Sequence, residues 1–200
     1  GDPQTNRFAS AVLNVEDRPL KRMAHVDLDY VYDPDPEQME RNLGKLVQRI
    51  ADMGISTVYL QAFADPQGDG LVRELYFPNR WLPMRADLFN RVAWQLRSRA
   101  NVEIYAWMPV LSFDMEPGLP RVARWSGAPA QAAAGQYQRL SPFDARVRQR
   151  IGDLYEDLGR HAVIDGILFH DDAVLTDYED AGEQALAAYR AAGLPGSIAE

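Results

Sequence analysis

The sequence contains no cysteine and only three histidines, His25, His161 and His170. The absence of cysteine excludes disulfide bonds, thiolate metal sites and a cysteine nucleophile. No two histidines have the i, i+4 spacing with which a helix presents a metal site, which argues against a histidine-rich metal centre. We therefore predict neither a bound metal nor a cofactor.

Long apolar runs and nucleotide-binding motifs are also missing. No segment approaches the roughly 20 apolar residues that cross a bilayer, so no membrane span is predicted. The sequence has no GxGxxG after a strand, no Walker A motif and no GxSxG elbow. Because the formal net charge is −8 and nucleic acid binds basic surfaces, nucleic acid is not an expected partner. The acidic balance suits a neutral or cationic ligand.

Four segments rich in β-branched and aromatic residues are predicted as strands: residues 23–32, 56–63, 102–113 and 163–170. The third and fourth are nearly continuously apolar, as in parallel strands covered on both faces. Helical patterns follow the strands, at about 35–53, 87–100, 141–158 and 180–192. This alternation is typical of a parallel sheet built from right-handed crossovers.

Four βα units are compatible with two architectures. One is the first half of a (β/α)8 TIM-type barrel, a fold that usually takes about 250 residues. The other is a complete open, doubly wound sheet. We expect the barrel, with residues 1–22 as an N-terminal linker or extension. Residues 23–200 then form the barrel domain, incomplete at its C-terminus because no terminating element follows Pro195.

In either architecture, catalytic residues belong at the carboxyl ends of the strands. Carboxylates occur there repeatedly, at Asp27, Asp29, Asp114, Asp171 and Asp172. Glycosidic bond cleavage commonly uses two carboxyl groups. Because Asp171 and Asp172 are adjacent, an extended chain would point them to opposite sides, so one alone would enter a site. Its partner would then come from another strand, such as Asp27 or Asp29, or from outside this chain.

Each candidate also has a structural interpretation. An aspartate just past a strand is often a turn former or the N-cap of the next helix, and this alternative is strongest for Asp172. The residues alone favour hydrogen-bonded structural histidines over ligands at His25 and His170. The acidic strand ends converge with aromatic-bearing connections at about 64–85 and 114–140. This combination favours a carbohydrate site, because aromatic faces stack on apolar surfaces and on cations while carboxylates bind ammonium groups.

Several segments resemble one family in order along the chain. They are HVDLDYVYD (25–33), GISTVYLQAFADPQGDG (54–70), YFPNRWLPMRADLFNRVAWQL (76–96), YAWMPVLSFD (105–114) and DGILFHDDAVLTDYED (165–180). The sequence from about Met23 onward is similar to the C-terminal domain of bacterial poly-β-1,6-N-acetylglucosamine N-deacetylases of the PgaB/BpsB type.

The resemblance implies a (β/α)-barrel that binds partly deacetylated poly-β-1,6-N-acetylglucosamine, a biofilm exopolysaccharide, and hydrolyses it as an endo-acting glycosidase. It implies an N-terminal deacetylase domain in the same polypeptide, and a periplasmic location associated with the outer membrane. Asp171 matches the family's essential aspartate in the HDD motif, with Asp172 as the alternative. The implied substrate-binding residues are Asp27, Asp29, Tyr30, Trp81, Trp107, Asp114 and His170.

Two other functions compete with this expectation. One is a non-catalytic module that guides the deacetylated polymer for export, which would tolerate Asp171→Asn far better than hydrolysis would. The other is a metal-dependent deacetylase, against which the histidine pattern argues.

Overall fold

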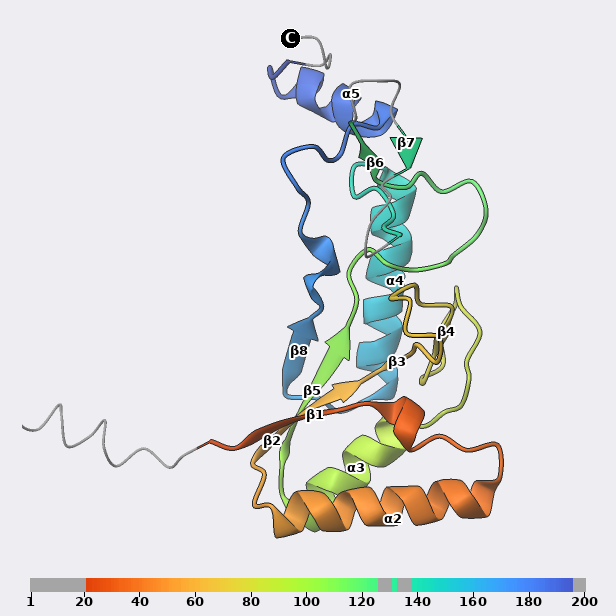
Figure 1. Cartoon of the computed structure of the whole chain (residues 1–200), viewed down its shortest axis with the longest axis vertical. Helices are drawn as coiled ribbons and strands as arrows, with labels where there is room; N and C mark the ends of the chain where they lie inside the picture. Colours follow the sequence, from red (N-terminus) through yellow and green to blue (C-terminus); the bar gives the residue numbers. More distant parts are fainter. Residues whose placement is uncertain (1–20, 126–130, 133–137, 196–200) are drawn as a thin grey trace, which may run out of the picture.

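The computed structural model describes residues 21–125, 131–132 and 138–195, so nearly all of the predicted 1–22 extension lies outside it. Figure 1 shows the elements. In chain order they are β1 (Met23–Val26), the 3₁₀ turn η1 (Leu28–Tyr30), α2 (Pro36–Asp52), β2 (Thr57–Gln61), β3 (Phe63–Ala64), β4 (Glu74–Leu75), α3 (Phe89–Ala100), β5 (Glu103–Met108), β6 (Ala123–Arg124), β7 (Gln131–Ala132), α4 (Ala145–His161), β8 (Gly166–Phe169), the 3₁₀ turn η2 (Asp171–Ala173) and α5 (Glu183–Ala191).

The predicted parallel sheet is confirmed. Its four strands lie in the order β1-β2-β5-β8, and every neighbouring pair is parallel. The order follows the sequence, without the reversal that marks a doubly wound sheet. The described sheet does not close into a barrel, since β1 and β8 are its two outer strands. The fold shown is therefore α/β with an open parallel sheet.

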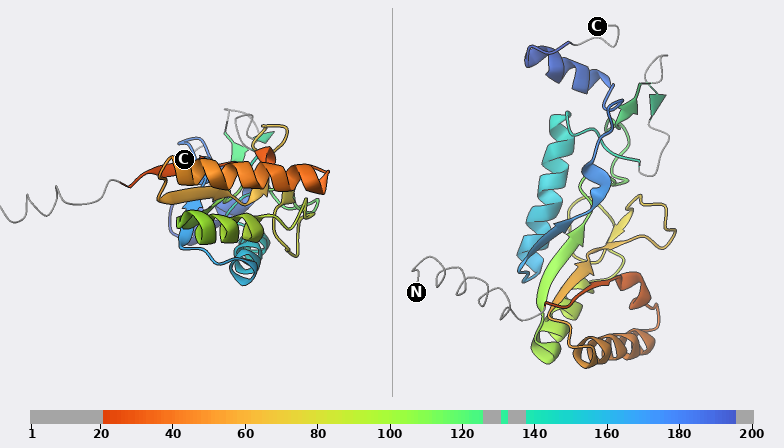
Figure 2. Two further views of the ribbon diagram at one scale, coloured as in Figure 1. Left: turned by 90° about the horizontal axis from the view of Figure 1, so that it is seen from below. Right: turned by 60° about the vertical axis from the view of Figure 1, so that its left-hand side comes forward.

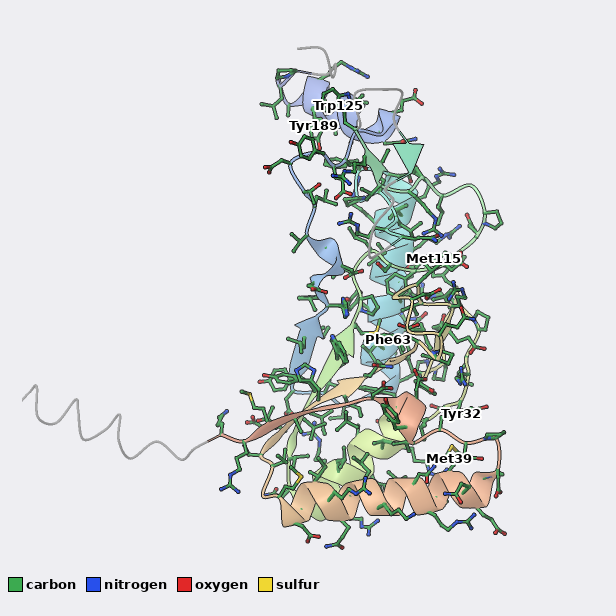
Figure 3. The ribbon with its side chains drawn as sticks, in the orientation of Figure 1. Tyr32, Met39, Phe63, Met115, Trp125 and Tyr189 are labelled. Atoms are coloured by element: carbon green, nitrogen blue, oxygen red, sulfur yellow. The ribbon has the colours of Figure 1, made fainter. Side chains whose placement is uncertain are left out.

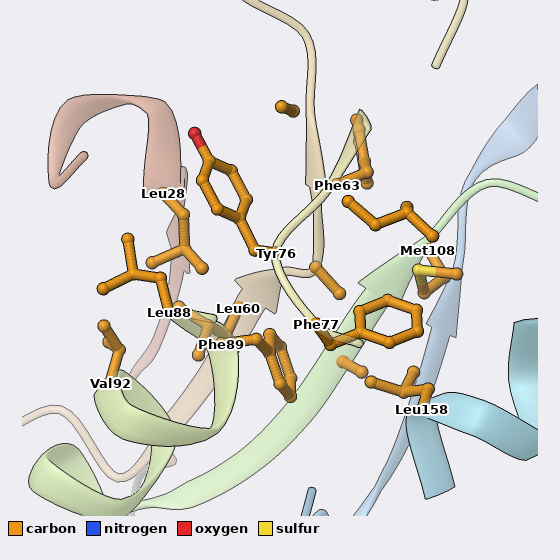
Figure 4. Packing of buried hydrophobic residues seen from close by; sticks show 14 of the residues in the cluster. Leu28, Leu60, Phe63, Tyr76, Phe77, Leu88, Phe89, Val92, Met108 and Leu158 are labelled. Carbon is orange, nitrogen blue, oxygen red and sulfur yellow. The ribbon is translucent and has the colours of Figure 1, made fainter. Parts of the chain in front are cut away.

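Helices cover one face of this sheet. Apolar residues of α2, α3 and α4 form one buried cluster with alternate residues of the strands, including Leu60, Ile104, Ala106 and Met108. Figure 4 shows Phe77, Phe89, Met108 and Leu158 packed together in this layer. Along β5 the intervening residues Glu103, Tyr105 and Trp107 are not buried. The expectation that both faces of β5 and β8 are covered is not met by the described residues, because α2, α3 and α4 join one core and α5 lies beyond the carboxyl end of the sheet (Figure 2).

The first and third strands end earlier than their apolar sequences suggest. β1 stops at Val26 because the Asp27 side chain caps η1, accepting a hydrogen bond from the Asp29 amide at 2.7 Å. β5 stops at Met108, before Pro109, which lacks an amide for the ladder. Both shortened strands place their following loops at the carboxyl edge of the sheet.

Two of the described helices, α2 and α4, begin after a capping aspartate. Asp35 caps α2 by accepting from the Glu37 amide, with Pro36 at the first helical position. Asp144 caps α4 by accepting from the amides of Arg146 and Val147. Because α4 is anchored by Leu154 and Leu158 in the shared core, it forms a fixed support beside β5 and β8.

Candidate active site

The carboxyl end of β8 carries the HDD motif, and its two aspartates differ completely in exposure. The Asp171 side chain is 77% exposed, whereas Asp172 is 0% exposed. Both lie in η2, directly after β8. Of the two, only Asp171 presents its carboxylate to solvent at this edge of the sheet.

Asp172 faces the protein interior. One of its oxygens, Oδ2, accepts hydrogen bonds from the amides of Leu111 and Ser112, both at 2.7 Å. The Val110 amide lies 2.9 Å from Oδ1 and 3.1 Å from Oδ2. These amides belong to the loop after β5. The alternative that Asp172 caps the next helix is wrong, because the N-cap of α5 is Gly182.

An aromatic group lies beside Asp171. The His170 Nδ1 atom is 2.9 Å from Asp171 Oδ1, which is an ion pair whenever the imidazole is protonated. The His170 ring stacks on the Trp107 ring of β5 with centroids 5.5 Å apart and planes 14° apart. Trp107 also meets His25 and Phe63 edge-on, at 5.2 and 5.6 Å. Phe63, labelled in Figure 3, belongs to β3 and follows the carboxyl end of β2 by two residues. The structure thus brings together the predicted residues Asp171, His170 and Trp107.

The carboxyl end of β1 carries a second pair of aspartates. Asp29 is held from two sides: its Oδ1 accepts from the Tyr76 hydroxyl at 2.5 Å and its Oδ2 from the Asp65 amide at 2.8 Å. Burial and this hydrogen bond raise the pKa of the Tyr76 phenol well above its ordinary value. Tyr76 therefore stays a donor, and Asp29 ties η1 to the connection after β3.

Asp27 points toward the neighbouring strand. Its Oδ1 accepts from the Gln61 side chain of β2 at 3.1 Å, in addition to the Asp29 amide. Burial raises the pKa of Asp27, and the carboxylates of Asp29 and Asp65 raise it further against the opposing effect of the Asp29 amide. A half-buried carboxyl group with acidic neighbours retains its proton to higher pH and gains most from a cationic ligand.

The remaining predicted binding residues lie in different surroundings. Tyr30 is 85% exposed in η1. Trp81 instead packs on α4: its indole donates to Asp153 at 2.9 Å, and the Arg150 guanidinium lies 3.5 Å from its ring centroid. Asp114 is exposed and pairs with Arg121 at 3.2 Å. Packing on α4 accounts for the position of Trp81 without a sugar.

Two residues were missed by the sequence reasoning. Gln61 is 4% exposed, and its amide bridges Asp27 and the Phe63 carbonyl. A lone amide inside an apolar strand was the available signal, since a buried polar group needs partners. Tyr76 is fully buried with its hydroxyl on Asp29, and its sequence position in a long connection gave no indication of this contact.

Neither a metal cluster nor a membrane helix is found in the described part of the chain. No group of three or more acidic, histidine or cysteine side chains there is arranged to hold a metal ion. No helix among these residues combines the length and apolar character of a membrane-spanning segment.

A family model described as hypothetical glycosyl hydrolase family 13 matches residues 25–200. The chain belongs to this family. It is 58% identical to the poly-beta-1,6-N-acetyl-D-glucosamine N-deacetylases of Escherichia coli K12 and O157:H7, over all of this chain and 30% of each relative. The chain therefore spans less than a third of the length of these curated relatives.

One solved structure agrees with the family assignment, and a second shares only the fold. The PgaB (BpsB) glycoside hydrolase domain from Bordetella bronchiseptica matches with 56% identity and a TM-score of 0.83, over 90% of this chain and 52% of that domain. A hypothetical protein from Ruminiclostridium thermocellum is 12% identical with a TM-score of 0.57, covering 87% of this chain and 94% of that one, a likeness of fold alone. The resemblance to PgaB/BpsB-type domains is confirmed, and this glycosyl hydrolase family chain corresponds to about half of the solved domain.

Proposed function

We propose that this chain is part of an endo-acting glycoside hydrolase domain that cleaves partially de-N-acetylated poly-β-1,6-N-acetylglucosamine. The observation that carries the proposal is the exposed Asp171 carboxylate at the end of β8, beside the Trp107–His170 stack. It lies at the edge of a parallel sheet where α/β enzymes place their chemistry. Membership of a glycosyl hydrolase family supports the reaction class.

Asp171 is assigned to the reaction, as the general acid or as the group that positions the reacting sugar. Asp27 is assigned to recognition. The paired carboxyl groups of glycosidases lie about 5–9.5 Å apart. The second catalytic carboxyl group is expected from another strand end of the complete domain.

Recognition of the polymer rests on charge and aromatic faces. A de-N-acetylated glucosamine unit carries an ammonium group, which a carboxylate with acidic neighbours binds favourably. Asp27 has that environment. The exposed Tyr30 ring offers a face on which a sugar ring stacks. The half-buried Trp107, whose ring stacks on His170, is proposed as a further contact to the sugar. The net charge of −8 adds attraction over longer range.

The wider setting of the domain is also a proposal. The sequential strand order and the helices on one face support closure into a (β/α)8 barrel by further strands. The names of the curated relatives support a deacetylase domain in the same polypeptide. A deacetylase partner fits a periplasmic location, associated with the outer membrane, during export of the polysaccharide.

The test is mass spectrometry of polymer products. The full-length protein and the 200-residue chain are each incubated with partially de-N-acetylated and with fully acetylated polymer, with and without a chelator. We expect shorter oligosaccharides from the partially de-N-acetylated polymer with or without chelator. With chelator present, we expect none from the fully acetylated polymer. Acetate release without shortening would instead indicate deacetylation and contradict the proposal.

A binding module is the second candidate. It is favoured by the exposed Tyr30 ring and the half-buried Asp27 at the β1 end, because an aromatic face and an acidic group hold a cationic sugar without a catalytic carboxyl pair. This candidate predicts that full-length protein binds the polymer but leaves its length unchanged.

A further inference from the structure

Asp172 has an environment unlike that of a reacting carboxyl group. It is fully buried, and the amides of Val110, Leu111 and Ser112 surround its two oxygens at 2.7–3.1 Å. Three consecutive amides that converge on one carboxylate form a small anion-binding nest. A carboxylate suits this nest because it only accepts, whereas an asparagine would turn an N–H₂ donor toward at least one amide.

The loop that provides these amides is itself anchored. The Tyr155 hydroxyl of α4 donates to the Pro109 carbonyl at 2.8 Å, and the Leu140 amide donates to the Leu111 carbonyl at 2.9 Å. Burial raises the pKa of the Tyr155 phenol, and the nearby Asp172 charge adds to the effect. The loop is thus hydrogen-bonded to α4, and Asp172 in turn hydrogen-bonds η2 to this loop.

Asp171 is held between two restrained neighbours. On one side His170 stacks on Trp107, and its amide donates to the Met108 carbonyl at 2.8 Å. On the other side Asp172 accepts hydrogen bonds from amides of the loop after β5. Because Asp171 and Asp172 share the η2 turn, we expect a shift of Asp172 to rotate the turn and displace the Asp171 carboxylate.

We propose that Asp172 is a positioning residue, which sets the direction of the Asp171 carboxylate by binding the amides of Val110, Leu111 and Ser112. The inference rests on the proposed function in so far as Asp171 is the reacting group. Reaction rates are sensitive to such placement, since a displacement of about 1 Å costs on the order of 100-fold.

The test compares Asp172→Asn with a matched variant, Asp180→Asn. Asp180 is 3% exposed and accepts from the amides of Ala123 and Gly182 and from the Ser141 hydroxyl, near α5. Both substitutions should lower the urea midpoint. Only Asp172→Asn should lower kcat of the full-length protein, by about 100-fold, with KM changed less than about twofold.

A spectroscopic signal reports the same geometry without turnover. The near-ultraviolet circular dichroism contributed by Trp107 is defined as the difference between the unsubstituted protein and Trp107→Phe. Asp172→Asn should lose this signal, because the His170 ring shifts with η2, and Asp180→Asn should retain it. If Asp172→Asn does not fold, Tyr155→Phe releases the same loop more gently and should lower kcat and the Trp107 signal in the same direction.

The outcomes separate the two proposals. Equal loss of kcat in Asp172→Asn and Asp180→Asn, or a folded Asp172→Asn with unchanged kcat and Trp107 signal, would overturn the positioning role. An unsubstituted full-length protein that leaves the polymer intact would overturn the proposed function instead. The Trp107 signal would still decide whether Asp172 sets the geometry of the turn.

Discussion

The carboxyl ends of β1 and β8 each carry two aspartates, but only the β8 pair is divided by burial. At β8, Asp172 is enclosed by backbone amides while Asp171 is exposed. At β1, Asp27 and Asp29 are both half-buried and both accept two hydrogen bonds. They differ in their partners: Asp29 ties η1 to the connection after β3, whereas Asp27 bonds to Gln61 of β2 and has acidic neighbours.

The difference between the two ends lies in the neighbours of Asp27 and Asp171. Asp27 has other carboxylates around it, which together with burial raise its pKa. Asp171 has a histidine beside it and an aromatic stack behind it. An acidic environment suits the binding of a cationic amine, whereas an exposed carboxyl group beside an aromatic stack suits chemistry on a sugar. We therefore assign recognition to the β1 end and reaction to the β8 end.

The largest effect is expected at Asp171. Asp171→Asn keeps the size of the side chain but cannot transfer a proton, so kcat for polymer shortening should fall about 1,000-fold. Release of reducing ends measures this rate. If Asp171→Asn retained most of the activity, Asp171 would not be the reacting group.

Tyr76→Phe tests whether Asp29 is the structural member of the β1 pair. The substitution removes a buried hydroxyl from a carboxylate, so the free energy of unfolding should fall by about 1.5–3 kcal/mol. Urea denaturation measures it. Phe89→Leu, a change in the same core that leaves Asp29 untouched, is the control, and only Tyr76→Phe should also weaken polymer binding by loosening η1.

Tyr30→Ala tests the exposed aromatic of the β1 end. Loss of a stacking face should weaken polymer binding by about 0.5–1.5 kcal/mol with no change in thermal stability. Trp94→Ala is the matched control, because Trp94 is 63% exposed on α3, a helix on the covered side of the sheet. Titration calorimetry measures the affinity of both variants for the polymer. Equal affinities of Tyr30→Ala and Trp94→Ala would contradict a sugar-binding role of Tyr30.

The smallest effect is a pH-dependent gain in stability from Asp27→Asn. Because the folded-state pKa of Asp27 is raised, its ionisation disfavours the native state as pH rises above the unfolded-state pKa. Asparagine keeps the Oδ1 acceptor for Asp29 and Gln61 without the charge. The variant should therefore melt at a higher temperature than the unsubstituted protein at pH 7, and the difference should vanish near pH 3. A lower melting temperature at pH 7 would argue against the acidic environment.

The sequence predicted the parallel sheet well, but not where β1 and β5 end. Alternating strand and helix patterns indicate parallel crossovers directly, and the strand order confirms them. The sequence did not predict the different surroundings of the two aspartates in each pair. Asp27, Asp29, Asp171 and Asp172 lie in or beside 3₁₀ turns, where the alternation of side chains along an extended strand does not hold.

The positions of Trp81 and Asp172 depend on contacts between residues far apart in the sequence. Trp81 had the features of a sugar platform, but Asp153, 72 positions away on α4, accepts its indole N–H. Asp172 is likewise positioned by amides about 60 positions earlier in the chain. Such partners depend on packing between elements, which periodicity and spacing do not report.

The most direct test of the division between strand ends measures binding and cleavage of the same partially de-N-acetylated polymer by Asp171→Asn and Asp27→Asn. We predict that Asp171→Asn binds normally and does not shorten the polymer. Asp27→Asn should need more polymer for half-maximal rate but reach a kcat close to that of the unsubstituted protein. Loss of binding in Asp171→Asn together with loss of kcat in Asp27→Asn would contradict the account.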